Sequence, residues 1–269
     1  MRLYGYRLTH SARAALFSVA PGRCLTAKEN TCYNTAKEER AMYFDTYYLI
    51  LVVPMIVLSL ICQANVSSVY KKYDKVPNSR GLTGAETAAN LLRRNGLADI
   101  RIECVHGRLT DHYDPRTRVL RLSEAVYSGT SVAALGIAAH ETGHAIQHAE
   151  SYGPLALRST MVPVANVGSM TGPYIAIIGL FFNWDILITI GILLFSVAVV
   201  FYLITLPVEF NASSRALEML ERDALLTDSE IGGSYKVLRA AALTYVASAL
   251  AAVMSLVRLL LLSRGRRRN

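Results

Sequence analysis

The sequence predicts a mainly α, multi-pass helical membrane protein that also carries a small α+β region with a short β-hairpin. Two observations indicate the membrane protein: 52% of the 269 residues are hydrophobic, and four apolar runs each have roughly the length of a bilayer span. The third observation is a polar region between the first two runs. It contains the stretch AAHETGHAIQ, residues 138–147, in which two histidines lie four residues apart.

The formal net charge of +8 is located at the two ends of the chain. Residues 1–41 contain seven Lys and Arg against three acids, and the last six residues, RGRRRN, add four Arg. The remainder is balanced, with 17 basic and 17 acidic residues, so a nucleic-acid partner is not expected. The four cysteines form no CxxC pair, so we expect neither a disulfide framework nor a cysteine metal site.

Residues 1–41 contain no acid before Glu29 and no long apolar run. Such a composition is typical of a targeting peptide. However, Met42 opens a compact lead into the first apolar run, so a start codon placed too early is the favoured interpretation. With either origin, we expect this extension to be disordered.

The first transmembrane helix is expected at residues 45–66, with a kink at Pro54 and the basic stretch KKYDK beyond its end. Residues 67–160 are interpreted as a zinc-motif domain, for reasons given below. Its first helix begins with a capping box of Thr83 and Glu86. The segments DIRIECV and RVLRLS are predicted to be two short strands on either side of the turn TDHYDPRT. A helix that starts near Ser131 then carries the histidine pair.

The rest of the chain is predicted to be almost entirely helical. Only NWD separates two runs of span length, which therefore form a tight antiparallel hairpin. Pro207 is expected to start a new helix, and Arg258, near the end of the fourth run, could reach the lipid headgroups. The predicted segments are a transmembrane hairpin at 161–206, a helical segment at 207–238, a fourth transmembrane helix at 239–263 and a basic tail at 264–269.

The histidine pair has the spacing of a zinc site on a helix. Residues i and i+4 lie on one face, about 40° and about 6 Å apart, so the imidazoles of His140 and His144 can hold one ion. Glu141 is turned about 100° from His140 and is placed to touch water near that ion. This is the physical basis of H-E-x-x-H: zinc lowers the pKa of the water to roughly 7, and the glutamate takes its proton.

The alternative is a chance pattern formed by two core histidines. Six histidines would produce the pattern in on the order of one such chain in a hundred, and the surrounding SVAALGIAAHETGHAIQ is typical of a buried helix. Gly143 costs about 1 kcal/mol relative to alanine, which is tolerable where backbone or substrate must come close. His148 lies about 12 Å from His140 along the helix, too far to share the ion.

A catalytic zinc needs a third protein ligand from another element. The candidates are Asp111, His112, Asp114, Glu209 and Glu218. Glu209 is favoured because it directly follows the membrane hairpin, in LPVEFNAS. The helix dipole alone, however, also favours an acid near a helix N-terminus.

Several polar residues could support the ligands or contact the substrate. Three of them closely follow Glu209 in the chain: Asn211, Ser213 and Arg215. His112, in TDHYDPRT, could orient a ligand or contact substrate, although turns are rich in Asp and Pro for backbone reasons. The strand VLRLS, if it lies at a sheet edge, could pair with an extended peptide.

Six stretches together resemble the YugP-type family of membrane zinc metallopeptidases: GLTGAE, LTDHYDPRT, AAHETGHAIQHA, PVANVGS, LPVEFNAS and AALTYVA. The resemblance runs from about Met42 to about Leu260 and implies a multi-pass bacterial membrane protein with a single zinc site. We therefore expect the α+β region to be a zincin-like catalytic region. More distantly, the chain is similar to HtpX-type and CAAX-prenyl membrane endopeptidases, in which a glutamate of an E-x-x-x-D pattern is the third ligand. By position this glutamate is Glu209, with Ser213 in place of the aspartate.

The three expected ligands must lie on one side of the membrane. Nine basic residues flank the spans on that side: Lys71, Lys72, Lys75, Arg80, Arg158, Arg215, Arg222, Lys236 and Arg239. The opposite side has Asp185 and the four C-terminal arginines. The positive-inside rule favours a cytoplasmic active site, with the arginine tail as contrary evidence unless the fourth run does not fully cross.

The sequence therefore predicts a membrane-bound, zinc-dependent endopeptidase that cleaves membrane proteins or peptides at the bilayer surface. His140, His144 and Glu209 would bind one Zn²⁺, and Glu141 would act as general base. The alternatives are a non-catalytic, zinc-containing scaffold or chaperone-like module and a transporter-like bundle with a chance motif. The near absence of charges in the spans disfavours the transporter. The expected partners are the substrate and the lipid bilayer, and no oligomeric state is predicted.

Overall fold

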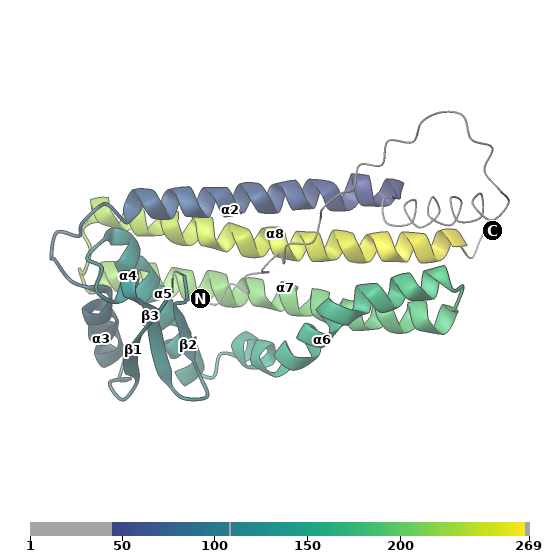
Figure 1. Ribbon diagram of the computed structural model, residues 1–269. Helices are drawn as coiled ribbons and strands as arrows, with labels where there is room; N and C mark the ends of the chain where they lie inside the picture. The colour runs from purple at the N-terminus through teal and green to yellow at the C-terminus, as the bar shows by residue number, and fades with distance from the viewer. Residues whose placement is uncertain (1–44, 108, 267–269) are drawn as a thin grey trace, which may run out of the picture.

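Long helices form a bundle, and a small α+β region lies at one end of it (Figure 1). The computed structural model describes residues 45–107 and 109–266. In chain order the elements are η1 (Tyr48–Val52), α2 (Val53–Tyr73), α3 (Gly84–Arg94), β1 (Arg101–Val105), β2 (His112–Asp114), β3 (Val119–Ser123), α4 (Glu124–Tyr127), α5 (Val132–Ala149), α6 (Gly153–Phe181), α7 (Asp185–Arg222) and α8 (Asp228–Arg266). The predicted extension at 1–41 and the end of the predicted basic tail, residues 267–269, lie outside the described residues.

Four helical segments are long and apolar enough to cross a membrane. Within the described part of the chain they are Tyr48–Tyr73, Gly153–Phe181, Asp185–Arg222 and Asp228–Gly265. Large apolar side chains point outward from them, including Leu60, Met170 and Leu193, each more than 60% exposed. Such a surface is stable in lipid rather than in water. The predicted fold class, a mainly α membrane protein with a small β region, is confirmed.

The ends of the long helices differ from the predicted segments. The predicted start of a new helix at Pro207 is wrong, because α7 continues without interruption from Asp185 to Arg222. The predicted segment 207–238 is therefore divided between the end of α7 and the start of α8. The polar ends of both helices pack against α5, and this packing offsets the roughly 3 kcal/mol that an internal proline costs.

The first helix and the membrane hairpin also extend beyond their predicted bounds. The first helix continues to Tyr73, and η1 gives way to α2 at Val53, next to the predicted kink at Pro54. A proline removes a backbone donor, and the wider π-helical turn accommodates that loss. Helix α6 begins at Gly153 and bends visibly (Figure 1), as expected for a helix that contains prolines.

Helices α6 and α7 form the tight antiparallel hairpin that the NWD sequence predicted. Helix α6 ends at Phe181 and α7 begins at Asp185. The two helices approach so closely that a Cβ atom on Gly172 would lie 2.8 Å from the backbone nitrogen of Phe195. Glycine at this position is therefore required by the packing of the hairpin.

Arg258 makes a buried ion pair at the end of the bundle far from the α+β region. Its Nε and Nη2 atoms donate to Oδ2 of Asp45 at 2.9 and 2.6 Å, and its guanidinium lies 5.1 Å from the centre of the Tyr48 ring. Only 8% of Arg258 is exposed. The expectation that Arg258 reaches the headgroups is wrong, because an acid at the start of the first helix holds it inside the protein.

The three strands form one sheet in the order β1-β3-β2, with β1 parallel and β2 antiparallel to β3. A hairpin is present, but β2 forms it with β3, so TDHYDPRT supplies a strand as well as a turn. The segment between β1 and β3 is long enough for the crossover that parallel strands need. Because β3 is the central strand, the idea that VLRLS pairs with a peptide at an edge is also wrong.

Helix α5 runs through the interior of the α+β region. The Ser131 hydroxyl accepts a hydrogen bond from the backbone N–H of Ala134 at 3.1 Å and caps the helix, as the sequence predicted. Its alanine-rich first half is buried among α3, the sheet and the ends of α7 and α8. This packing fixes the position of the histidine pair, which follows directly on the same helix.

Candidate metal centre

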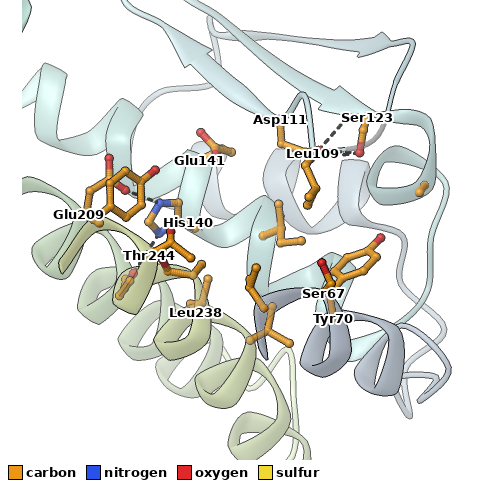
Figure 2. A pocket seen from close by; sticks show the side chains of 18 of the residues that line it. Ser67, Tyr70, Leu109, Asp111, Ser123, His140, Glu141, Glu209, Leu238 and Thr244 are labelled. Atoms are coloured by element: carbon orange, nitrogen blue, oxygen red, sulfur yellow. Dashed lines mark hydrogen bonds and ion pairs between the residues drawn. The ribbon is translucent and has the colours of Figure 1, made fainter. Parts of the chain in front are cut away.

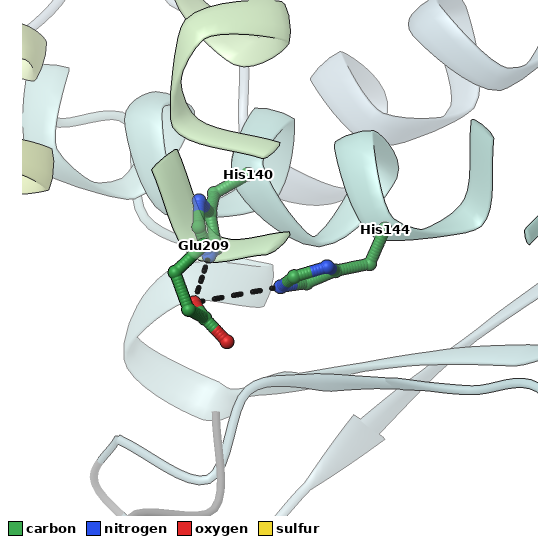
Figure 3. A group of neighbouring side chains, drawn as sticks. All are labelled: His140, His144 and Glu209. Carbon is green, nitrogen blue, oxygen red and sulfur yellow. Dashed lines mark ion pairs between the residues drawn. The ribbon is translucent and has the colours of Figure 1, made fainter. Parts of the chain in front are cut away.

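Two histidines of α5 and one glutamate of α7 meet in the interior (Figure 3). Oε2 of Glu209 lies 3.3 Å from Nε2 of His140 and 3.7 Å from Nε2 of His144. One ligand atom from each of the three residues lies within 4.8 Å of the others. The only such group of three His, Cys, Asp or Glu side chains in the described part of the chain is the one that the sequence predicted.

The two separations from Glu209, 3.3 and 3.7 Å, are close to those around a tetrahedral zinc ion. Bonds of 2.0–2.1 Å at tetrahedral angles place ligand atoms about 3.3 Å apart. Oε2 of Glu209 is buried and makes no hydrogen bond to any described residue, a costly arrangement unless a cation is bound there. Burial alone would lower the pKa of His144, but the negative charge of Glu209 raises it above the ordinary value. A metal ion bound here would therefore compete with a proton for this imidazole.

The other ring nitrogen of each histidine has a polar partner. Nδ1 of His140 lies 3.2 Å from the Ser213 hydroxyl, and Nδ1 of His144 donates to Oε1 of Gln147 at 3.0 Å. An imidazole that carries its proton on Nδ1 has a free lone pair on Nε2, the atom that faces Glu209. These contacts orient both rings toward Glu209.

A hydrogen-bonded chain joins His144 to helix α7. The Gln147 amide donates to the Val208 carbonyl and to Oδ1 of Asn211, each at 2.9 Å. Arg215 Nε donates to the same Asn211 oxygen, and its Nη2 lies 2.7 Å from Glu150. The sequence suggested that Asn211, Ser213 and Arg215 could support the ligands. Ser213 contacts His140, Asn211 contacts Gln147 and Arg215 contacts Asn211, and their support of a metal ligand stays a prediction.

Helices α5 and α7 approach each other closely at Gly143. A Cβ atom there would lie 2.8 Å from the carbonyl oxygen of Ala212. The glycine in the motif therefore lets the backbone of α7 come close. Close approach of backbone was one of the two explanations for Gly143 that the sequence suggested. The short distance between the helices lets Glu209 reach the histidines.

Glu141 is buried beside the histidines and is held by the sheet. Its Oε2 accepts a hydrogen bond from the backbone N–H of Tyr113 on β2 at 3.1 Å. Asp111, two residues before Tyr113, accepts hydrogen bonds from the Ser123 N–H at 2.7 Å and from the Ser123 hydroxyl at 3.0 Å. Burial raises the pKa of the Asp111 carboxyl, although the Ser123 N–H opposes this shift. Asp111 thus ties the segment before β2 to β3.

The remaining acids and histidines that were considered as ligands lie outside the group. His112 bonds through Nδ1 to the Thr110 carbonyl, and Glu218 is exposed on α7. Burial would raise the pKa of Asp114, but hydrogen bonds from Thr117, Arg116 N–H and Arg121 lower it to about 2, as expected for a turn acid. His148 bonds to the Tyr113 hydroxyl.

Sequence reasoning missed three residues of the centre. Gln147 could have been found, because it lies three residues after His144 and so on the same face of the helix. Arg158 of α6, with Nη1 3.3 Å from Oε1 of Glu209, was interpreted only as a basic flank of a span. Tyr245 of α8 contacts Glu209, and nothing in the pattern of an apolar run separates it from other membrane-facing aromatics.

An apolar pocket of about 330 Å³ opens on the centre (Figure 2). His140, Glu141 and Glu209 line one end, and Ser67 and Tyr70 of α2 line the other. Its walls are mainly aliphatic, and they include Val66, Ile137, Val237, Leu238 and Ala241. The pocket can take an extended apolar group that reaches His140, Glu141 and Glu209 at one end.

Comparisons with known proteins agree with this geometry. Residues 48–264 match the family model described as "Putative neutral zinc metallopeptidase". Over 215 residues the chain is 49% identical to the "Putative membrane protease YugP" of Bacillus subtilis (strain 168), an alignment that covers 80% of this chain and 96% of that relative. No solved structure matches the chain significantly.

Proposed function

Because the chain belongs to the YugP-type family of zinc metallopeptidases, we propose that it is a membrane-bound, zinc-dependent endopeptidase that cleaves membrane proteins or peptides at the bilayer surface. One observation carries the proposal: the imidazoles of His140 and His144 and the carboxylate of Glu209 converge, with Oε2 of Glu209 3.3 and 3.7 Å from the two Nε2 atoms, and Glu141 lies next to them.

The proposal gives each residue of the centre a role. His140, His144 and Glu209 hold one zinc ion, and Arg158 pairs with the second oxygen of Glu209. When bound, zinc supplies Lewis acidity, which lowers the pKa of water to about 7 and polarises a carbonyl group. Glu141 accepts the proton of the attacking water and delivers it to the leaving amine. The Tyr113 N–H donates to Oε2 of Glu141 and fixes the carboxylate beside the centre.

The choice of substrate class rests on the surroundings of the centre. The pocket beside Glu141 is lined mainly by aliphatic side chains, which favours a large apolar residue next to the scissile bond. Phe210, adjacent to Glu209 in the chain, is 48% exposed, and Leu243 on α8 is 40% exposed. Both belong to the apolar surface of the candidate spans, which supports cleavage close to the bilayer.

The deciding experiment compares Glu141→Gln with the wild-type protein. Both are purified in detergent without added metal, assayed for zinc and incubated with a quenched-fluorescent peptide of apolar sequence. We expect about one zinc per chain in both proteins, with hydrolysis reduced by on the order of 10² to 10⁴-fold in the variant. Glu218→Gln removes an exposed acid of α7 and is expected to cleave normally.

This comparison also separates the proposal from a zinc-containing scaffold or chaperone-like module. A scaffold would retain zinc in both proteins but would cleave the peptide in neither. Equal cleavage by wild-type and Glu141→Gln protein would remove Glu141 from the reaction and contradict the mechanism.

We further propose that the protein crosses the bacterial cell membrane four times, with its centre on the cytoplasmic face. Support comes from the excess of Lys and Arg at the end of the bundle that carries the α+β region. Cys104 on β1 is exposed, so a chain that retains only this cysteine should react with a membrane-impermeant maleimide in inverted vesicles and not in intact cells. A chain whose only cysteine is Asn183→Cys, in the turn between α6 and α7, should react with the maleimide in intact cells and not in inverted vesicles. The opposite pattern would invert the assignment.

A further inference from the structure

A second hollow lies between α2 and α8, away from the metal centre. It is a groove of about 330 Å³ lined by two helix faces: Asn65, Val69, Lys72 and Tyr73 on α2 and Lys236, Arg239, Ala240 and Leu243 on α8. The spacing of three, four and seven residues keeps each set on one face of its helix. The groove therefore follows both helices for about 10 Å at 1.5 Å per residue.

Three cations gather at one end of this groove. Lys72, Lys236 and Arg239 are all exposed, and no carboxylate of residues 45–107 or 109–266 lies within ion-pair distance of any of them. The ammonium groups of Lys72 and Lys236 lie 5.6 and 5.8 Å from the centre of the Tyr73 ring. One aromatic ring thus holds both lysines at the groove.

The Tyr73 ring is itself fixed against α8. A Cβ atom on Gly233 would lie 2.9 Å from Cδ1 of Tyr73, so the ring occupies the space that a larger residue would need. The first turns of α8 are also anchored, because the Ser234 hydroxyl donates to the Val132 carbonyl of α5 at 2.8 Å. The cations therefore extend from a rigid pair of helices.

The polarity of the groove changes along its length. The cations lie toward the end of α2 and the start of α8, the part of both helices that reaches the α+β region. Val69, Ala240 and Leu243 continue the groove in the opposite direction, together with the uncharged polar Asn65. Beyond them Ile61 and Leu250 belong to the exposed apolar surface of the spans. Positive charge at the membrane boundary above a mainly apolar channel matches a phospholipid, with its phosphate outermost and its acyl chain below.

We propose that this groove binds one anionic membrane phospholipid, whose headgroup phosphate contacts Lys72, Lys236 and Arg239 and whose acyl chain lies along Val69 and Leu243. The lipid occupies the leaflet next to the metal centre. The assignment rests on the groove and on the candidate membrane spans, and it does not depend on the proposed peptidase reaction.

Native mass spectrometry of the full-length protein tests this site. The protein is mixed with phosphatidylglycerol and phosphatidylcholine of identical acyl chains, and retained lipid is counted. We expect one tightly held phosphatidylglycerol and at least about tenfold weaker retention of phosphatidylcholine. At roughly fivefold per cation, Lys72→Gln/Lys236→Gln/Arg239→Gln should weaken phosphatidylglycerol binding on the order of a hundredfold.

Two further variants separate the groove from net charge and from misfolding. Lys75→Gln/Arg80→Gln/Arg116→Gln removes three exposed cations outside the groove and should bind lipid normally. Lys72→Arg/Lys236→Arg/Arg239→Lys preserves the charges and should also bind, which shows that changes at these positions are tolerated. Circular dichroism and zinc content are measured for every variant.

Several outcomes would overturn the proposal. If Lys72→Gln/Lys236→Gln/Arg239→Gln retained as much phosphatidylglycerol as the wild-type protein, or if the wild-type protein retained both lipids equally, the bound lipid would be non-specific. An equal loss in the control variant would assign the effect to net charge. Millimolar inorganic phosphate should leave the phosphatidylglycerol bound, and complete displacement by phosphate would identify a free-phosphate site instead.

Discussion

The two ends of the helical bundle bury charge in different ways. At the end with the α+β region, Glu141, His140 and Glu209 are almost fully buried, and polar side chains from α5, α6 and α7 surround them. At the other end, one ion pair between Arg258 and Asp45 lies among apolar helices. The first arrangement makes one carboxylate oxygen available to a cation, whereas the second satisfies an arginine within the protein. Only the first has the chemistry of a functional centre.

The largest effect is expected from a substitution at the end of the bundle that carries the α+β region. Glu209→Ala removes the oxygen that faces both imidazoles, so we expect zinc per chain to fall from about one to near zero and peptide hydrolysis to disappear. Metal analysis of protein purified without added zinc measures this. Glu218→Ala, at an exposed position on the same helix, is the control. Stoichiometric zinc in Glu209→Ala would exclude Glu209 as a required ligand.

The second-largest effect is expected at the ion pair between Arg258 and Asp45. Arg258→Met leaves Asp45 buried without its partner, and we expect a loss of about 3 kcal/mol in the free energy of unfolding, or roughly 6 to 12 °C in apparent Tm. Zinc content should not change. Adding Asp45→Asn should recover much of the loss, because a buried pair replaced by neutral groups is often tolerated. Arg264→Gln, at an exposed arginine of α8, should unfold as wild type does. Loss of zinc in Arg258→Met would show that the two ends are coupled.

The smallest of the three effects is expected from a residue that contacts one of the proposed ligands. Gln147→Leu removes the partner of His144 and the link to Asn211, and we expect zinc affinity to fall tenfold to a hundredfold. Competition with a zinc chelator measures the affinity. Gln63→Leu, at an exposed position on α2, should have no effect. Unchanged affinity in Gln147→Leu would show that the hydrogen bond does not orient the imidazole.

Local sequence patterns predicted much of the fold and of the candidate centre. The capping box at Thr83, the cap at Ser131 and the hairpin around NWD are properties of a few adjacent residues, and all three are present. The pairing of His140 with His144 follows from helix geometry alone. The proposed third ligand, Glu209, was favoured from its position after the membrane hairpin, and the resemblance to known families indicated the same residue.

Features that depend on packing between distant segments could not be predicted. Pro207 reads as a helix start, but contacts of α7 with α5 keep the helix continuous. The β2 strand is three residues long and becomes recognisable only when β3 lies beside it. Arg158 and Arg258 are both isolated cations at the ends of apolar runs. Their acidic partners are 51 and 213 residues away in the chain, so both were interpreted as membrane flanks.

The continuity of α7 has a mechanical consequence. About 36 Å of unbroken helix, at 1.5 Å per residue, connects Asp185 at the far turn with Glu209. A rotation of one degree about the far turn would displace the Glu209 backbone by about 0.6 Å, whereas metal–ligand bond lengths tolerate only about 0.2 Å. Helices tilt to match the hydrocarbon thickness around them. At the proposed zinc site, the thickness of the surrounding bilayer would therefore be one of the quantities that set how tightly the carboxylate and the imidazoles bind the ion.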